Sequence, residues 1–214
     1  LVGSEMCIRD RFGRDLVNWN NNFTWAKWVT PSRDLISAFK QEGDEVRFKE
    51  SIVYYDCNWS NYYPSDNYPF MYKCRSANSS IIKYRYADVL LLKAEALIMQ
   101  DTPDLEGAAD IIDEVRDRAK LGALPTSVRS NKNVLLNALL KERRLELAFE
   151  GQRWFDLVRL DKVEEVMNAV YAKDSGRKAQ IYTFDKNSYR LPIPQSVILS
   201  LIHISEPTRL GMIS

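Results

Sequence analysis

Residues 141–160 read KERRLELAFEGQRWFDLVRL, a stretch that combines nine charged side chains with large apolar ones. Leu145, Ala148 and Phe149 recur at helical spacing, and the charged residues do the same, so both kinds fall on one side of a predicted helix. An unpaired charge in a core costs several kcal/mol, so such a face must pair its guanidinium and carboxylate groups. We expect a structural ion-pair lattice made of Glu142, Arg143, Arg144, Glu146, Glu150, Arg153 and Asp156.

An active site is the alternative interpretation of the same stretch. Glu146 and Glu150 are four residues apart, and paired carboxylates can act as general acid and base. Ion pairs with Arg143, Arg144 and Arg153 would instead keep both carboxylates ionised and make them poor acids. This favours the structural interpretation, which predicts that Arg153→Ala destabilises the fold by a few kcal/mol.

Both ends of the chain resemble foreign sequence. A single DNA string encodes residues 1–10 on one strand and residues 199–209 on the other, and it resembles the transposon-end adapter of sequencing libraries. We therefore expect residues 1–11 and 199–214 to be adapter-derived. The only histidine, His203, then lies in the foreign tail, which removes the commonest general base and metal ligand from residues 12–198.

Composition and motifs exclude several function classes. The chain of 214 residues has a net charge of +1, and this charge is unchanged without the three arginines and three acidic residues of the expected adapter-derived ends, so nucleic acid is not an expected partner. No apolar run approaches the roughly 20 residues that span a bilayer. The sequence has no Gly-rich phosphate loop, metal-ligand cluster or nucleophile elbow, so we expect no cofactor and no metal.

The first part of the protein, residues 12–80, is predicted to be rich in loops. A short helix is expected over residues 33–40, ended by Gly43. Alternating apolar residues indicate a strand over residues 45–55. Residues 58–80 contain two prolines and many polar side chains, which predicts a loop.

Residues 81–172 are predicted to be helical, and residues 173–198 irregular. A helix over residues 84–100 carries a stripe of small and large apolar side chains suited to a close helical neighbour. Asp104 is the expected N-cap and Gly122 the expected C-cap of a second helix. The second helix is predicted over residues 107–121 and a third over 133–151. The third helix either continues through residues 152–160 or is followed there by a fourth. A further helix is predicted over residues 163–171.

A helix, a short turn and a second helix over about 38 residues resemble one tetratricopeptide-type unit. Because a single unit cannot bury its own face, neighbouring units are expected upstream. The predicted fold class is therefore mostly α: tetratricopeptide-like helical pairs in an α/α superhelix, with long irregular loops and little β.

Four segments in this order resemble the C-terminal region of the SusD/RagB family of outer-membrane nutrient-binding lipoproteins. They are RYADVLLLKAEAL at residues 85–97, VRDRAKL at 115–121, the opening stretch at 141–160, and LPIPQSVI at 191–198. TPSRDLISAF at residues 30–39 and GDEVRF at 43–48 also fit the family. The resemblance thus covers nearly all of residues 30–198.

The resemblance implies a binding protein that is not an enzyme. Members of the family are anchored by a lipidated N-terminal cysteine on the outer face of the outer membrane, where they pass oligosaccharides or other nutrients to a SusC-like TonB-dependent transporter. Tetratricopeptide-like pairs form one side of such proteins and a loop-rich ligand surface the other. We expect the signal peptide, the anchor cysteine and the N-terminal repeats to be missing from this chain.

The aromatic loop is the predicted ligand site. Eight of the nineteen residues 54–72 are Tyr, Trp or Phe. Sugars present apolar C–H faces bounded by hydroxyls, which suits flat rings next to Asn and Asp side chains. The alternative, that a long loop packs against its own rings, stays open. The expected ligand-binding residues are Trp59, Asn61, Tyr62, Tyr63, Asp66 and Tyr68.

Two other functions compete with glycan binding. A tetratricopeptide-like adaptor would bind protein helices and no glycan, but it has no need of eight rings in one segment. A carboxylate-dependent glycoside hydrolase would need an acid and a base on facing elements, and nothing in the sequence marks them. Cys57 and Cys74 either form a disulfide in an exported protein or remain thiols.

Overall fold

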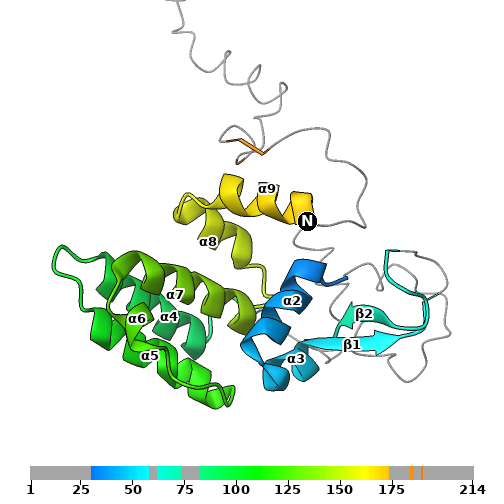
Figure 1. The fold of residues 1–214 in the computed structure, drawn as a ribbon, viewed down its shortest axis with the longest axis horizontal. Coiled ribbons are helices and arrows are strands. Elements are labelled where there is room, and N and C mark those ends of the chain that lie inside the picture. The colour runs from blue at the N-terminus through cyan, green and yellow to red at the C-terminus, as the bar shows by residue number, and fades with distance from the viewer. Residues whose placement is uncertain (1–29, 58–61, 74–81, 174–183, 186–188, 190–214) are drawn as a thin grey trace, which may run out of the picture.

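The computed structural model describes residues 30–57, 62–73, 82–173, 184–185 and 189 (Figure 1). Within these ranges the chain forms eight helices and one two-stranded sheet, which confirms the predicted, mostly α fold class. Cys57 is buried and has no disulfide partner among the described residues. Cys74 and both expected adapter-derived ends lie outside them.

The first predicted helix is confirmed as α2, Arg33–Glu42. The Ser32 hydroxyl accepts a hydrogen bond from the Leu35 backbone N–H at 3.1 Å and caps the first turn. Gly43 ends the helix with φ 68°, a left-handed conformation that glycine adopts at little cost.

The strand predicted over residues 45–55 is correct only in its last four residues. Residues Glu45–Ser51 form helix α3, and β1 spans Ile52–Tyr55. The Asp44 carboxylate accepts a hydrogen bond from the Arg47 backbone N–H, which starts a helix within the alternating pattern. A capping residue at the start therefore outweighs a short alternation of apolar side chains.

The predicted loop over residues 58–80 contains a strand, β2, at Tyr68–Met71. It runs antiparallel to β1, with Ile52 opposite Met71. All four residues of β2 are buried, so tertiary packing holds them extended where local sequence signals a turn. Pro69 is tolerated because each strand of a two-stranded sheet has an edge that needs no donor.

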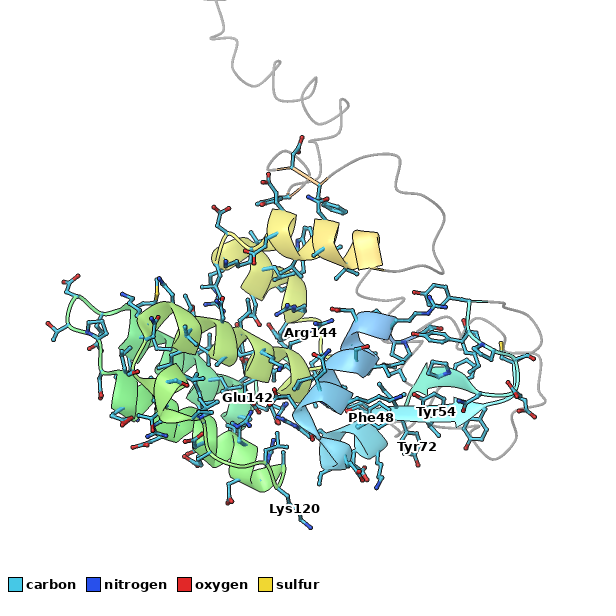
Figure 2. All side chains as sticks on the ribbon, in the orientation of Figure 1. Phe48, Tyr54, Tyr72, Lys120, Glu142 and Arg144 are labelled. Atoms are coloured by element: carbon cyan, nitrogen blue, oxygen red, sulfur yellow. The ribbon has the colours of Figure 1, made fainter. Side chains whose placement is uncertain are left out.

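A small hydrophobic cluster joins this first part to the opening stretch of sequence. Phe48 contacts Phe39 and Tyr54, with ring centroids 5.8 and 6.3 Å apart (Figure 2). Leu145 and Ala148 pack into the same cluster and are buried. Apolar residues of the 141–160 stretch thus hold α2, α3 and β1 against the helical part.

The predicted helical hairpin is confirmed as α4, Tyr86–Met99, and α5, Leu105–Arg118. Asp104 caps α5 as expected, because its carboxylate accepts a hydrogen bond from the Gly107 N–H at 2.9 Å. The main core lies between α4, α5 and the third long helix, α7, Lys132–Glu146. Its fully buried side chains include Leu91, Ala94, Ile98, Ile112, Leu135 and Leu139.

The end of α5 and the segment after it differ from the prediction. The helix stops at its C-cap Ala119 and not at Gly122. Lys120 takes the left-handed conformation, with φ 60°, and the Leu121 N–H donates to the Arg116 carbonyl. A one-turn helix, α6 at Thr126–Arg129, was not predicted because four residues are too few for a periodic signal.

The helix predicted over residues 133–151 ends earlier than expected. After α7 the chain turns, Phe149 and Gly151 have φ of 66° and 81°, and a separate helix α8 spans Arg153–Arg159. Helix α9, Val163–Lys173, confirms the last predicted helix. The turn means that the charged residues of the opening stretch belong to two helices and the bend between them.

In Figure 1, α2, α3 and the sheet lie beyond the C-terminal end of α7, and α4 to α6 lie below α7. Helices α8 and α9 lie next to each other beyond the C-terminal half of α7 (Figure 1). None of the helices in the described part of the chain has the length and apolar character needed to cross a bilayer.

Candidate functional site

The described aromatic residues of the predicted ligand loop pack against one another. Tyr62 and Tyr63 meet edge to face with ring centroids 4.9 Å apart, and Tyr63 meets Tyr68 similarly at 5.5 Å. The guanidinium carbon of Arg33 lies 4.2 Å from the Tyr62 centroid and 4.6 Å from that of Tyr63. Cation–π and edge-to-face contacts therefore tie the loop to the first turn of α2.

Burial divides the predicted ligand residues. Tyr68 is 2% exposed and its hydroxyl accepts a hydrogen bond from Thr30 at 3.4 Å, so its ring has no free face for a sugar. Its prediction as a ligand residue was wrong, because its side chain packs into a hydrophobic cluster with Cys57, Phe70 and Met71. Tyr62 and Tyr63 are half-buried, and Asp66 at the tip is exposed. Trp59 and Asn61 lie outside the described residues.

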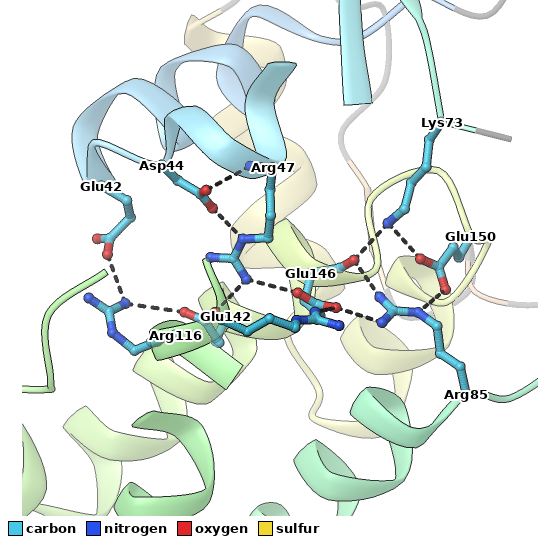
Figure 3. A network of polar contacts seen from close by, with 10 residues as sticks. Glu42, Asp44, Arg47, Lys73, Arg85, Arg116, Glu142, Glu146 and Glu150 are labelled. Carbon is cyan, nitrogen blue, oxygen red and sulfur yellow. Dashed lines mark hydrogen bonds and ion pairs between the residues drawn. The ribbon is translucent and has the colours of Figure 1, made fainter. Parts of the chain in front are cut away.

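A second polar centre surrounds the end of α7 (Figure 3). The carboxylate of Glu142 is 2.6 Å from an Arg47 nitrogen and 3.2 Å from an Arg116 nitrogen. Arg116 also pairs with Glu42 at 3.0 Å. Arg47 reaches this centre from α3 and is held at its other side by Asp44 (Figure 3). Glu142 thus joins α7 to both halves of the molecule.

Glu146, one helical turn later, has the densest set of partners. It pairs with Arg85 at 2.5 Å, with Arg47 at 3.1 Å and with Arg118. Glu150 lies beyond the end of α7 and pairs with Lys73 at 2.6 Å and Arg85 at 2.8 Å. We call Glu142, Glu146, Glu150 and their cationic partners the glutamate lattice. Figure 3 labels four of its cations, Arg47, Lys73, Arg85 and Arg116. The fifth cation is Arg118.

The expected partners of Glu146 and Glu150 were wrong. Arg143 is buried and pairs instead with Asp88 and Asp156, each at 2.9 Å. Arg144 pairs with Asp34 on α2 at 2.6 Å. The reason is geometric: arginines on the same helix leave it in directions different from those of the glutamates, so each meets carboxylates of another element.

Arg153 departs furthest from the prediction. Its guanidinium donates to the Leu140 carbonyl at 3.2 Å, and no carboxylate of the described residues lies within ion-pair distance. Burial, together with repulsion from Arg144, lowers the pKa of Arg153 to about 10. It lies at the start of α8, behind the turn at Gly151, which moves it away from the glutamates.

The cations of the glutamate lattice were not identified as site residues from the sequence. Arg47 lies in GDEVRF, Arg85 in RYADV, and Arg116 and Arg118 in VRDRAKL, which are three of the segments that carry the family resemblance. The signal was therefore present in the motifs. Pairing each motif's arginine with a glutamate of the 141–160 stretch would have found most of the lattice.

The electrostatics of Glu146 suit a structural role and not proton transfer. Burial alone would raise the pKa of Glu146, but hydrogen bonds from Arg118 and Arg85 lower it to about 2. Burial raises the pKa of Glu142 despite the opposing effect of Arg47 and Arg116. An ionised carboxylate held by three cations is a weak base and no acid near neutral pH. The part of the chain that is described also contains no group of side chains able to hold a metal ion.

Comparison with known proteins identifies the family. The model of the SusD family matches residues 66–201, which is more than half of the chain. The chain belongs to the SusD family. The matched segment contains α4 to α9 and the glutamates of the lattice, and it begins after Tyr62 and Tyr63.

Two SusD-like proteins from Formosa agariphila are similar in sequence. SusD-like protein P38 is 43% identical over 99 residues, which cover 44% of this chain and 19% of that protein. SusD-like protein P2 is 36% identical over 126 residues, which cover 56% of this chain and 24% of that protein. The chain thus matches between about a fifth and a quarter of the length of these SusD-like relatives.

The fold is also similar to that of a SusD superfamily protein from Bacteroides vulgatus, known from a crystal structure. The superposition covers 72% of this chain and 39% of that one, with a TM-score of 0.52 and 22% identity. This likeness supports the SusD fold of the chain. It carries no information on ligand.

Proposed function

We propose that the chain is the C-terminal part of a non-catalytic cell-surface protein that binds glycans or other nutrients. The complete protein works with a SusC-like TonB-dependent transporter to capture and import oligosaccharides. A lipid on an N-terminal cysteine holds it at the extracellular face of the outer membrane. Membership of the SusD family over residues 66–201 is the observation that carries this proposal.

The hairpin of β1 and β2 is the proposed part of the ligand surface within this chain. Tyr62 and Tyr63 are half-exposed next to the exposed tip that contains Asp66, which combines ring faces with hydrogen-bonding groups. Trp59 and Asn61 complete the proposed set. The contacts among these rings and Arg33 fix their orientation, so little side-chain freedom is lost when a sugar binds.

The glutamate lattice is proposed to support the fold without touching ligand. Its three carboxylates are buried and each has at least two cationic partners. A hydrolase would need one carboxyl group that keeps its proton near neutral pH and faces the substrate. Glu146 does the opposite, because its pKa is about 2.

Affinity electrophoresis of the complete protein against a panel of polysaccharides tests the function. We expect at least one polysaccharide to retard the protein, with no release of reducing sugar. Retardation by none would refute glycan binding and favour the adaptor alternative. Release of reducing sugar would refute the non-catalytic assignment.

Variants of the retarded protein test the site separately. Trp59→Ala and Tyr62→Ala should abolish or strongly reduce retardation. Tyr84→Ala is the matched control, because Tyr84 is 74% exposed and lies outside the hairpin. If the hairpin variants migrate as the unsubstituted protein does, the ligand surface lies elsewhere while the proposed function stands.

A further inference from the structure

The small sheet that carries the proposed ligand residues depends on other elements for its position. We call its described part, residues 52–57 and 62–71, the aromatic hairpin. Each of its two strands has four residues. An isolated two-stranded hairpin is only marginally stable in water. The contacts that the aromatic hairpin makes with the helices therefore decide how firmly its rings are held.

One such contact comes from Lys73, which follows β2 by two residues. Its ammonium nitrogen donates to the backbone carbonyl of Glu146, the last residue of α7, at 2.7 Å and lies 2.6 Å from the Glu150 carboxylate (Figure 3). The last carbonyls of a helix have no partner within it and carry the negative end of its dipole, which favours a cation there. Lys73 thus holds the end of the aromatic hairpin against the end of α7.

The bend after α7 supplies a second contact through Phe149. We call this bend, residues 147–151, the α7 turn. Phe149 has a φ of 66°, which is unfavourable for a bulky side chain. Such a backbone persists only where the surrounding structure imposes it, and functional sites are common places for it. The Phe149 side chain packs against two hydrophobic clusters, one around Phe70 of the hairpin and one around Phe39 of α2.

Tyr63 links the α7 turn to the proposed ligand surface. Among the described residues, Tyr63 and Phe149 are the two that pack against both of these clusters. The Tyr63 hydroxyl also donates to the Pro31 carbonyl at 2.9 Å. A displacement of the Phe149 ring would therefore disturb the packing that orients the Tyr63 ring.

A third contact leads from α7 to the same rings through α2. Arg144 pairs with Asp34 at 2.6 Å, and the neighbouring Arg33 lies over the rings of Tyr62 and Tyr63. The end of α7 thus supports the aromatic hairpin through Lys73, through Phe149 and through the first turn of α2. A sugar loses less affinity to ordering costs when the rings that it meets are already fixed.

We propose that Lys73 and Phe149 are positioning residues of the ligand surface, which fix where the aromatic hairpin holds Tyr62 and Tyr63. Neither residue touches the ligand. The inference rests on the proposed function, because it takes these two rings as part of the sugar-binding surface. It adds that the α7 turn, which lies in the charged 141–160 stretch, controls ligand affinity from behind the hairpin.

Hydrogen exchange of the complete protein, followed by mass spectrometry, tests the positioning role directly. Lys73→Met removes the ammonium group, and Lys73→Arg keeps a cation with several donors. Arg85 still pairs with Glu146 and Glu150 in both variants, so the lattice keeps a counter-charge. Lys49→Met is the matched control, since the Lys49 side chain is 72% exposed on α3.

In Lys73→Met the backbone amides of residues 52–57 and 68–71 should exchange at least about tenfold faster, as expected for the loss of one hydrogen bond to a charged group. Exchange in α5 should not change, and Lys73→Arg should restore most of the protection. Unchanged exchange in the hairpin of Lys73→Met would overturn the proposal. Faster exchange spread equally over the hairpin and α5 would also overturn it, because it would show a general loss of stability.

Phe149→Gly tests the second positioning residue without straining the backbone, because glycine adopts a φ of 66° readily. The variant keeps the α7 turn and removes the ring, and it should show the same local increase of exchange in the hairpin. Exchange as slow as in the unsubstituted protein would show that the ring has no positioning role.

Affinity electrophoresis measures the consequence for binding, with soluble starch, xylan and mannan included in the polysaccharide panel. For a polysaccharide that retards the unsubstituted protein, Lys73→Met should raise the Kd at least about tenfold. Lys73→Arg should restore most of the affinity, and Lys49→Met should not change it. Normal retardation of Lys73→Met would overturn this inference and leave the proposed function intact, whereas no retardation of the unsubstituted protein would overturn both.

Discussion

Replacing Arg143 with alanine should destabilise the chain much more than replacing Arg153, although both arginines belong to the same charged stretch. The Arg143 side chain is 2% exposed and lies 2.9 Å from both Asp88 and Asp156. Within the described part of the chain, Arg153 makes a single hydrogen bond, to the Leu140 carbonyl. The comparison separates a buried ion pair from a half-buried charge whose partner among the described residues is neutral.

The magnitudes follow from what each substitution leaves behind. Without Arg143, Asp156 keeps Arg159 at 2.7 Å, but Asp88 has no second ion-pair partner among the described residues. Removing one partner of a buried pair costs about 3–5 kcal/mol, so we expect about 4 kcal/mol for Arg143→Ala. Arg153→Ala should cost about 1 kcal/mol, the typical net worth of one hydrogen bond. Relief of the repulsion between Arg153 and Arg144 offsets part of that cost.

Urea denaturation of the 214-residue chain at pH 7, followed by far-UV circular dichroism, measures both changes. Midpoints are compared only between variants with equal slopes. Arg143→Met is the matched control, since it keeps most of the volume and removes the charge. A nearly unchanged Arg143→Met would show that the alanine variant reports a cavity. Equal destabilisation by Arg143→Ala and Arg153→Ala would refute the reasoning.

Three further outcomes are expected. Glu146 has a pKa of about 2, against 4.5 in the unfolded chain, so it contributes roughly 3 kcal/mol that is present above pH 4.5 and lost as the pH falls towards 2. Urea midpoints measured between pH 2 and 6 should therefore lose this acid dependence in Glu146→Gln. Glu142→Gln should keep it, because the pKa of Glu142 is raised and not lowered. An unchanged dependence of the midpoint on pH in Glu146→Gln would contradict the assignment to Glu146. Gly151→Ala should cost about 1 kcal/mol because its φ is 81°. Gly122→Ala should be close to neutral in thermal melts, because an added Cβ meets no atom within 4 Å at either glycine and Gly122 lacks the positive φ; equal effects would argue against backbone strain. Asp104→Ala should cost about 1 kcal/mol and reduce helicity in circular dichroism, since it removes the cap of α5, and an unchanged melting temperature would count against that cap.

Long periodic segments of this chain could be predicted, and short ones could not. Helices α2, α4, α5 and α9 follow from apolar spacing, and the caps at Asp104 and Gly43 were recognisable from residue type. Strand β2 was missed because its extended form depends on burial against β1 and the aromatic rings. Helix α3 was mistaken for a strand because its seven residues are too few to show a clear helical period. The capping aspartate, Asp44, was the signal that indicated a helix.

The candidate ligand residues show the same limit. Composition pointed to the loop around Tyr62 and Tyr63, and both are half-exposed there. Composition could not distinguish them from Tyr68, which is 2% exposed. The exposure of these side chains depends on how β1 pairs with β2. The loop between the two strands carries no strong hairpin signal, so this pairing could not be predicted.

The sequence by itself determined the mostly α-helical class of this protein, its SusD family and the presence of buried charges near the end of α7. Charge type and helical spacing are local properties, and they are enough to show that such a face must be neutralised. The tertiary structure alone decided which charges meet. Glu146 pairs with Arg85, 61 residues away in sequence, and with Arg47, 99 residues away, while Arg153 finds no carboxylate in the described part of the chain. Such pairs form only when the turn after α7 and the packing of α3 and α4 bring distant segments together, and no local pattern encodes that geometry.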